Sequence, residues 1–139
     1  GQRFINLAGG LNIAGGLPSS GKVSGEWVLE ENPDVIILAS CYPKEGFGYS
    51  LTYDTLAEES LNAVLNNSVI GETGAAKKGN VYLYSYYGLG SGGQTQLGAL
   101  YLAKRIYQDL FMDIDPEQFH REYFEEWFGI PYQGVWFYP

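Results

Sequence analysis

The sequence is poor in cysteine, histidine and basic side chains. Cys41 and His120 are the only residues of their types, so an internal disulfide and a metal cluster held by thiolates are excluded. Lysine and arginine total 8 against 16 acidic residues, which gives a net charge of −8. We expect no nucleic-acid or anionic-lipid partner, because both require a basic surface. No apolar run approaches the roughly 20 residues of a membrane-spanning helix, so we expect no membrane span in this chain.

The same scarcity limits enzymatic chemistry. The sequence has no GxSxG motif whose serine the single histidine could activate as a base. No His, Asp and Glu residues recur at metal-ligand spacing. We interpret Cys41, which follows an apolar run, as a small buried side chain rather than a nucleophile. The sequence therefore predicts no enzyme, with no catalytic residue, metal site or cofactor.

Aromatic residues, by contrast, are abundant. Hydrophobic residues make up 45% of the 139 positions, enough for the core of one domain. There are 12 tyrosines, 7 phenylalanines and 3 tryptophans, and tyrosine suits binding surfaces because it joins a rigid ring to a polar hydroxyl. We expect a single α/β domain over 1–139. Its abrupt apolar start at 3–8, predicted as a strand, favours a domain excised from a longer protein.

The stretch 23–39 predicts a short helix followed by a buried strand. Ser24 suits the N-cap and Glu26 places an acid in the first turn, where the helix dipole favours negative charge. Pro33 ends the helix, because the residue before a proline is pushed out of the α region. Residues 35–39 are a continuous apolar run, typical of a strand covered on both faces. A capped helix leading into a buried strand is half of an α/β layered sheet.

Three further segments continue this α/β pattern. Thr55 and Glu58 form a capping box at the start of a helix predicted over 55–66. Residues 80–86 are rich in valine, tyrosine and leucine and fit a strand. Residues 94–110 carry an apolar stripe at helical spacing and predict the longest helix.

A last helix is predicted to begin at the Asp-Pro pair 115–116, which supplies a cap and a proline at the first helical position. Phe119, Tyr123 and Trp127 then recur every four residues, and we predict that they form its buried stripe. His120 lies one position off that stripe, so we expect it on the solvated face.

Two glycine-rich segments leave a nucleotide-binding function open. Residues 16–22 follow most of a P-loop pattern, but Val23 replaces the residue that holds magnesium and Pro18 removes a backbone donor. Residues 88–93 spell GxGxxG between a strand and a helix, but no second strand with an acidic residue follows. A nucleotide-binding α/β enzyme fragment is therefore the alternative function. A purely structural interaction domain is a third.

Three segments resemble one family of binding proteins. Residues 23–37 resemble the V-S-x-E…N-P-D-V-I-I segment of substrate-binding proteins that serve ABC importers of the iron-siderophore and cobalamin type. Residues 76–82 are similar to the A-V-K-x-G-x-V-Y entry to the last strand of the same lobe. Residues 98–117 resemble the frequent L-A-K-x-L-Y-P-E-L-F-x-D-I-D-P pattern, except that Gln108 stands where proline is usual. The three segments agree in order and spacing over most of 23–128.

The resemblance implies a three-layer α/β/α sandwich with a mainly parallel central sheet. It would be the C-terminal lobe of a two-lobed protein, with the N-terminal lobe and the linker helix outside this chain. In that family the ligand binds between the lobes, and the glutamate corresponding to Glu26 docks onto arginines of the membrane permease. The resemblance thus implies an extracytoplasmic protein, periplasmic or cell-surface and anchored through a region outside this chain. It would deliver a ferric siderophore, cobalamin, haem or another metal chelate to an ABC permease.

Ligand-binding side chains are predicted from their positions after the two strands, because α/β sheets bind ligands at the carboxyl ends of strands. The loop 9–22 is expected, by the resemblance, to face the same ligand. Ordinary surface or interlobe packing is the alternative role for each tyrosine. The candidates are Tyr42, Phe47, Tyr49, Tyr86 and Tyr87.

Overall fold

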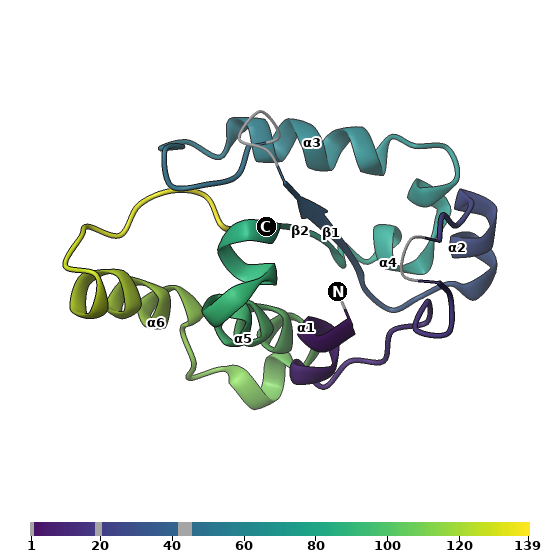
Figure 1. The fold of residues 1–139 in the computed structure, drawn as a ribbon. Helices are drawn as coiled ribbons and strands as arrows, with labels where there is room; N and C mark the ends of the chain where they lie inside the picture. Colours follow the sequence, from purple (N-terminus) through teal and green to yellow (C-terminus); the bar gives the residue numbers. More distant parts are fainter. Residues whose placement is uncertain (1, 19–20, 42–45) are drawn as a thin grey trace.

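The structure, a computed structural model, describes residues 2–18, 21–41 and 46–139. It confirms the predicted α/β fold, with a small sheet between two layers of helices (Figure 1). In chain order the helices and strands are α1 Gln2–Leu7, α2 Gly25–Glu31, β1 Ile36–Ser40, α3 Thr55–Leu65, α4 Gly74–Lys77, β2 Val81–Ser85, α5 Thr95–Ile106, α6 Pro116–Glu122 and β3 Phe137–Tyr138. Short 3₁₀ turns lie at Ile70–Glu72, Gly92–Gln94 and Gln108–Phe111, and π-helical turns at Tyr86–Gly90 and Tyr123–Trp127.

The sheet has the strand order β1-β2-β3 and is mixed. β1 and β2 pair in parallel, with Ser40 opposite Ser85, and the two-residue β3 pairs antiparallel with β2. All residues of the central strand β2 are buried, whereas β1 is largely half-buried and Ala39 is exposed. The prediction that 35–39 is covered on both faces holds in part: Val35 and Ile37 pack against one core cluster and Leu38 against another, but the run is only half-buried and β1 lies at the edge of the sheet in the described part of the chain.

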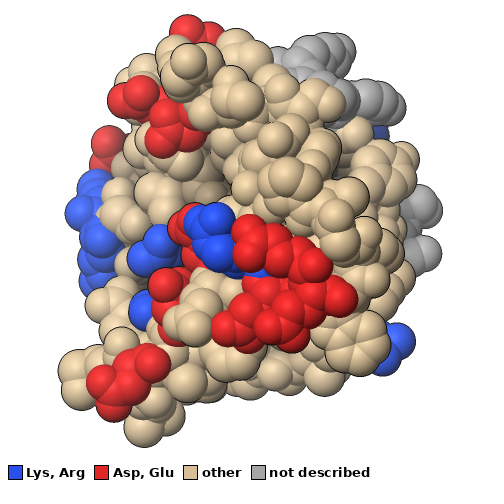
Figure 2. Space-filling model, turned by 90° about the vertical axis from the view of Figure 1, so that its left-hand side faces the viewer, with Lys and Arg blue, Asp and Glu red and all other residues tan. Residues whose placement is uncertain are grey.

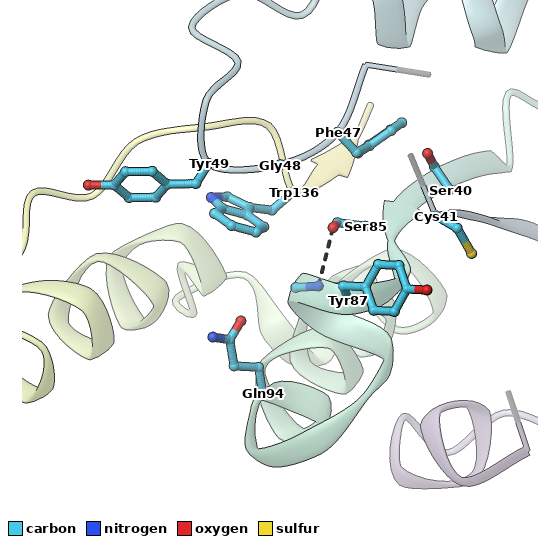
Figure 3. Close-up of a pocket in the computed structure, with 10 residues that line it drawn as sticks. Ser40, Cys41, Phe47, Gly48, Tyr49, Ser85, Tyr87, Gln94 and Trp136 are labelled. Atoms are coloured by element: carbon cyan, nitrogen blue, oxygen red, sulfur yellow. Dashed lines mark hydrogen bonds between the residues drawn. The ribbon is translucent and has the colours of Figure 1, made fainter. Parts of the chain in front are cut away.

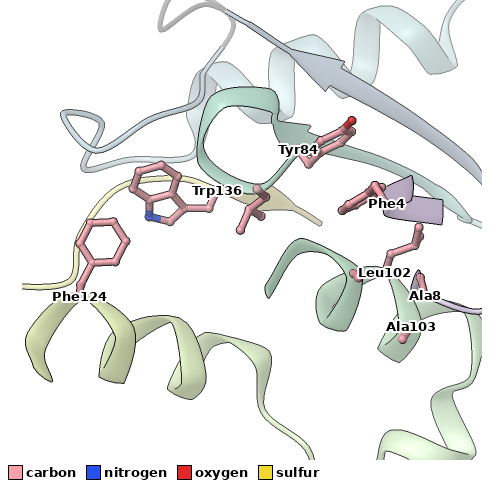
Figure 4. Packing of buried hydrophobic residues seen from close by; sticks show 9 residues of the cluster. Phe4, Ala8, Tyr84, Leu102, Ala103, Phe124 and Trp136 are labelled. Carbon is pink, nitrogen blue, oxygen red and sulfur yellow. The ribbon is translucent and has the colours of Figure 1, made fainter. Parts of the chain in front are cut away.

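The layers follow from how the helices cover the sheet. α3 lies over one face, α1 and α5 lie over the other, and α6 packs beside α5 (Figure 1). Phe4 of α1 stacks on Tyr84 of β2 with ring centroids 4.7 Å apart, and Figure 4 shows the cluster around this pair. A smaller cluster of Phe47, Ala57 and Leu83 packs under α3. The main core contains Phe4, Ala8, Tyr84, Leu89, Ala99, Leu102, Ala103, Phe124 and Trp136.

The first element corrects the sequence prediction. Residues 3–8 were predicted as a strand, but Gln2–Leu7 forms the helix α1. Phe4 and Ala8 are both buried, and their spacing of four residues places them on one helical face. The segment is too short for its apolar residues to distinguish a period of 2 from a period of 3.6.

The helix α2 forms as predicted. The Ser24 hydroxyl accepts a hydrogen bond from the Trp27 amide at 3.1 Å, and Glu26 lies in the first turn. Asn32 ends the helix in the left-handed conformation, with φ of 42°. Its side-chain oxygen accepts a hydrogen bond from the Gly74 amide at 2.8 Å, which ties α2 to the start of α4.

The helices α3 and α5 are confirmed with changes at their ends. Asp54 is the N-cap of α3 and makes no side-chain capping bond, so the predicted capping box of Thr55 and Glu58 was wrong. α5 is the longest α-helix described, but it ends at Ile106 rather than at residue 110. A 3₁₀ turn follows and leaves Leu110 exposed, outside the stripe predicted for it.

In α6 the buried face differs by one residue from the prediction. Asp115 caps the helix as predicted, accepting from the Glu117 amide at 3.0 Å. His120 is completely buried, whereas Phe119 is 45% and Trp127 79% exposed. Both stripes have four-residue spacing, and the one containing Pro116, His120 and Phe124 contributes the buried residues of this segment. The predictions of a solvated His120 and a buried stripe through Phe119 were therefore wrong.

Candidate ligand-binding site

A pocket of about 330 Å³ lies at the carboxyl ends of β1 and β2 (Figure 3). Parallel strands end at the same edge of a sheet, which is where open α/β sheets bind their ligands. The loop after β1, the turn after β2, the start of α5 and the C-terminal segment complete the walls. The lining residues are Ser40, Cys41, Phe47, Gly48, Tyr49, Ser85, Tyr87, Gly88, Gln94 and Trp136.

Two buried serines end the paired strands beneath the pocket. Ser40 and Ser85 lie directly opposite each other in the strand register. The Ser85 hydroxyl accepts a hydrogen bond from the Gly88 amide at 3.2 Å (Figure 3), which caps the π-helical turn Tyr86–Gly90. This turn carries Tyr87, whose side chain lines the pocket and is 70% exposed. The end of β2 therefore positions an accessible aromatic ring at the mouth of the pocket.

The loop with Phe47 and Tyr49 is held by the C-terminal segment. Gly48 and Val135 exchange two backbone hydrogen bonds, with N–O distances of 2.8 and 3.3 Å. The Tyr49 hydroxyl donates to the Pro131 carbonyl at 3.0 Å. These contacts join residues more than 80 positions apart in the sequence. This wall of the pocket is therefore a product of tertiary packing.

Trp136 forms the wall between the pocket and the core. Its indole Nε1 donates to the Gln133 carbonyl at 2.9 Å, and its side chain is almost completely buried. Its ring packs directly on the backbone of Gly88, where an added Cβ would lie 2.3 Å from the ring. Glycine at position 88 is therefore required for this close approach.

The pocket is aromatic and uncharged among the residues described. No lysine, arginine, aspartate or glutamate of the described ranges lines it, and its polar groups are hydroxyls, an amide and a thiol. The Gln94 Oε1 atom is buried without a hydrogen-bond partner in the described structure. An unpaired buried acceptor costs free energy, so a ligand with a donor would be favoured there. Cys41 is half-buried at the edge of the pocket, less buried than predicted.

The structure brings three of the five predicted ligand-binding residues to this pocket. Phe47, Tyr49 and Tyr87 line it. Tyr86 does not line it, and its ring packs edge-on against Tyr87 with centroids 5.5 Å apart. Tyr42 lies outside the described residues. The role of these side chains in ligand binding stays a prediction.

The sequence did not predict the other seven lining residues, four of which are the polar or aromatic side chains Ser40, Ser85, Gln94 and Trp136. Ser40 and Ser85 carried a usable signal, since each directly follows an apolar run and parallel strands bring such positions together. Gln94 lies where a glycine-rich turn meets a helix, which gives no sign of the direction of its side chain. Trp136 follows no strand, and only the packing of the C-terminal segment brings it to the sheet edge.

One glycine in each glycine-rich segment is engaged in a contact within the protein. A Cβ on Gly90, in the GxGxxG segment, would lie 2.7 Å from the Tyr84 ring. In the P-loop-like segment, the Gly21 amide donates to the Pro18 carbonyl at 2.7 Å and is not free for a phosphate. The described residues of the loop 9–22 lie outside the pocket, so the structure does not bring this loop to the predicted site.

Glu26 lies at the other end of the sheet from the pocket. α2 precedes β1 and therefore lies at the amino end of that strand (Figure 1). The Glu26 side chain is exposed, and its carboxylate makes no hydrogen bond or ion pair with the described residues. It is thus accessible to a partner without disturbing the pocket.

Neither metal-ligand clusters nor membrane spans accompany these sites in the described ranges. No group of three or more His, Cys, Asp or Glu side chains there could hold a metal ion. The helices of these ranges are also too short or too polar to cross a bilayer.

Comparison with solved structures identifies the architecture. The chain matches the TroA-like periplasmic binding protein FepB from Veillonella parvula with a TM-score of 0.83 and 25% identity, over 97% of this chain and 40% of that protein. The chain has the fold of one lobe of a TroA-like periplasmic binding protein. It also matches the molybdate periplasmic binding protein MolA of a Haemophilus influenzae ABC transporter, with a TM-score of 0.68 and 25% identity, over 95% of this chain and 38% of MolA. Family models and curated protein sequences give no match.

This lobe spans about 40% of the length of the solved binding proteins that it matches. An open, uncharged aromatic wall can bind apolar or conjugated surface and accept or donate a few hydrogen bonds.

Proposed function

We propose that the chain is the C-terminal lobe of an extracytoplasmic solute-binding protein that captures a ferric siderophore or a similar metal chelate for an ABC importer. The observation that carries the proposal is the uncharged aromatic pocket at the carboxyl ends of β1 and β2, on a lobe of the TroA-like fold. Aromatic side chains offer rigid contact area with polar tips, which suits a large, flat ligand.

The lining chemistry favours a chelate over a small oxyanion. MolA was solved with bound molybdate, and a desolvated oxyanion needs cationic or free N–H donors around it. In this pocket no described lysine or arginine is available, and the Gly88 amide already donates to Ser85. In a chelate the ligand itself coordinates the metal, so the protein needs mainly contact area and a few hydrogen bonds. Cobalamin and haem also coordinate their metal within the ligand, so the binding test includes them.

The other wall of the site is expected from a second lobe outside this chain. A pocket open on one side buries only part of a ligand, whereas small-molecule sites typically bury about 70–90% of the ligand surface. We therefore expect weak binding to the single lobe and strong binding to the two-lobed protein. The extracytoplasmic location and an anchor outside this chain belong to the same proposal.

The direct test is a fluorescence titration of this chain and of the full-length protein with ferric siderophores, cobalamin, haem, molybdate, ATP and NAD. The proposal predicts strong quenching of the full-length protein by one metal chelate, and weaker binding of that chelate to this chain. Tight binding of ATP or NAD to this chain would contradict it and would favour the nucleotide-binding alternative. Preference for molybdate would contradict the chelate assignment while leaving the solute-binding role intact.

Glu26 is proposed as the permease-docking residue of this lobe. The proposal is supported by the resemblance of its segment to the docking segment and by its exposed, unpaired carboxylate in the first turn of α2. Glu26→Arg should abolish binding of the protein to permease reconstituted in nanodiscs. Glu30→Arg, an exposed charge reversal on the same helix, is the matched control and should bind nearly normally. Equal losses in the two variants would indicate a general charge effect and contradict docking through Glu26.

A further inference from the structure

A second pocket, of about 200 Å³, lies beside the C-terminal segment. It is lined from the start of α3, from α5, from the start of α6 and from residues 132–138. It shares only Trp136 with the strand-end pocket. The proposed capture of a chelate makes no use of it.

Aromatic rings form most of this second pocket. Tyr101, Tyr132, Trp136, Phe137 and Tyr138 all line it. Tyr101 and Phe137 are stacked, with centroids 5.3 Å apart and ring planes at 17°. The faces of aromatic rings carry partial negative charge, so a ring face that is left uncovered in the pocket attracts a cation as well as apolar surface.

Two carboxylates, Asp54 and Glu117, complete the lining, and no described lysine or arginine joins them. Asp54 is the N-cap of α3, yet its side chain makes no capping hydrogen bond. Burial raises the pKa of Tyr138, and the negative charges of Glu58 and Asp54 raise it further. Two carboxylates thus line the pocket, and the Asp54 carboxylate does not cap its own helix.

One cationic side chain of the protein, Arg121, already contacts two residues that line this pocket. The Arg121 guanidinium lies over the Tyr132 ring, 4.9 Å from its centroid, and pairs with Glu117 at 3.5 Å. Figure 2 views this end of the molecule and shows acidic side chains gathered around a few basic ones. Arg121 is about half exposed, as is Glu117, so this pair is weak and replaceable.

We propose that this second pocket binds a small organic cation of the quaternary-ammonium type. The aromatic rings would surround the alkylated nitrogen, and Asp54 and Glu117 would supply the opposite charge. A metal ion fits less well, because the pocket offers only two carboxylates and no described group of three or more His, Cys, Asp or Glu side chains could hold such an ion. The inference stands on this pocket alone and does not depend on the proposed transport function.

The test compares choline with its neutral isostere 3,3-dimethyl-1-butanol. Each is titrated into the 139-residue chain while the three tryptophan indole N–H signals are followed by NMR. Choline should shift the Trp136 signal saturably and leave those of Trp27 and Trp127 unchanged. The isostere should bind about tenfold more weakly, because it lacks the charge. Equal affinity of the two compounds, or no shift with choline, would overturn the proposal.

Matched variants assign the site. Asp54→Asn and Glu117→Gln should each weaken choline binding about threefold, the effect of one exposed charge pair. Arg121→Gln should strengthen it, because the competing cation is removed. Tyr87→Ala, in the strand-end pocket, should leave it unchanged. Loss of the choline shift in Tyr87→Ala alone would move the binding to the first pocket and overturn the assignment. Urea unfolding of each variant verifies that it is folded.

Discussion

The two ends of the sheet, one with the pocket and one with α2, differ in the contacts that hold their residues in place. α2 is defined by neighbours in sequence, from the Ser24 cap to the turn at Asn32. The pocket joins residues far apart in the chain, with the loop at Gly48 paired to Val135 and Trp136 packed on Gly88. We therefore infer that ligand contact and permease docking, as proposed, are physically separable. A change at one end should leave the other intact.

The largest effect is expected from Trp136→Ala at the pocket end. This side chain is almost completely buried and contacts Gly88, His120 and Phe124. Its loss leaves a cavity and should lower the free energy of unfolding by about 3–5 kcal/mol, measured in urea. The amides of α2 should keep their relative protection in native-state hydrogen exchange. A loss below about 1 kcal/mol would show that Trp136 does not join the wall to the core.

A second effect, also confined to the pocket end, comes from His120. Burial among aromatic rings lowers its pKa to about 4, whereas a free imidazole titrates near 6.5. Between these values the unfolded chain binds one proton more than the folded chain, so stability is complete above pH 6.5 and decreases as the pH falls toward 4. The free energy of unfolding should decrease by about 2 kcal/mol from pH 7 to pH 5.

The control for this pH dependence is His120→Phe, which keeps an aromatic ring in the same surroundings. Its free energy of unfolding should change little between pH 7 and pH 5, because carboxylates titrate mostly below that range. If the variant keeps the wild-type pH dependence, the titrating group lies elsewhere.

The smallest effect is expected at the α2 end. Ser24→Ala removes the hydroxyl that accepts from the Trp27 amide and should cost about 1 kcal/mol. Asp54→Ala is the comparison, since the Asp54 side chain makes no capping bond and should cost less. Faster hydrogen exchange of the α2 amides in Ser24→Ala, with unchanged chelate affinity, would support the independence of the two ends. A change in chelate affinity in Ser24→Ala would contradict that independence.

Local chemistry accounts for the parts of the fold that the sequence predicted. Ser24 and Asp115 cap the helices that their positions indicated, and the apolar runs before Ser40 and Ser85 became paired strands. Tyr87 was also predicted correctly to lie near the carboxyl end of a strand, and it lines the pocket there. In each case neighbouring residues are enough to indicate the element, whereas the pairing of the strands depends on tertiary contacts.

The failed predictions involve choices that only tertiary contacts make. In α6, two stripes with the same spacing compete, and contacts with Tyr101 and Trp136 accompany the burial of His120 rather than Phe119. The burial of His120 then follows from residues far away in the sequence. Trp136 reaches the pocket by the same long-range packing, which no local pattern indicates.

The central claim is that ligand contact and permease docking lie at opposite ends of this lobe. Its most direct test measures chelate affinity and transport for Tyr87→Ala and Glu26→Ala in the two-lobed protein. We expect Tyr87→Ala to weaken chelate binding, and Glu26→Ala to abolish transport with chelate affinity unchanged. A loss of chelate affinity in Glu26→Ala, or normal affinity in Tyr87→Ala, would contradict it.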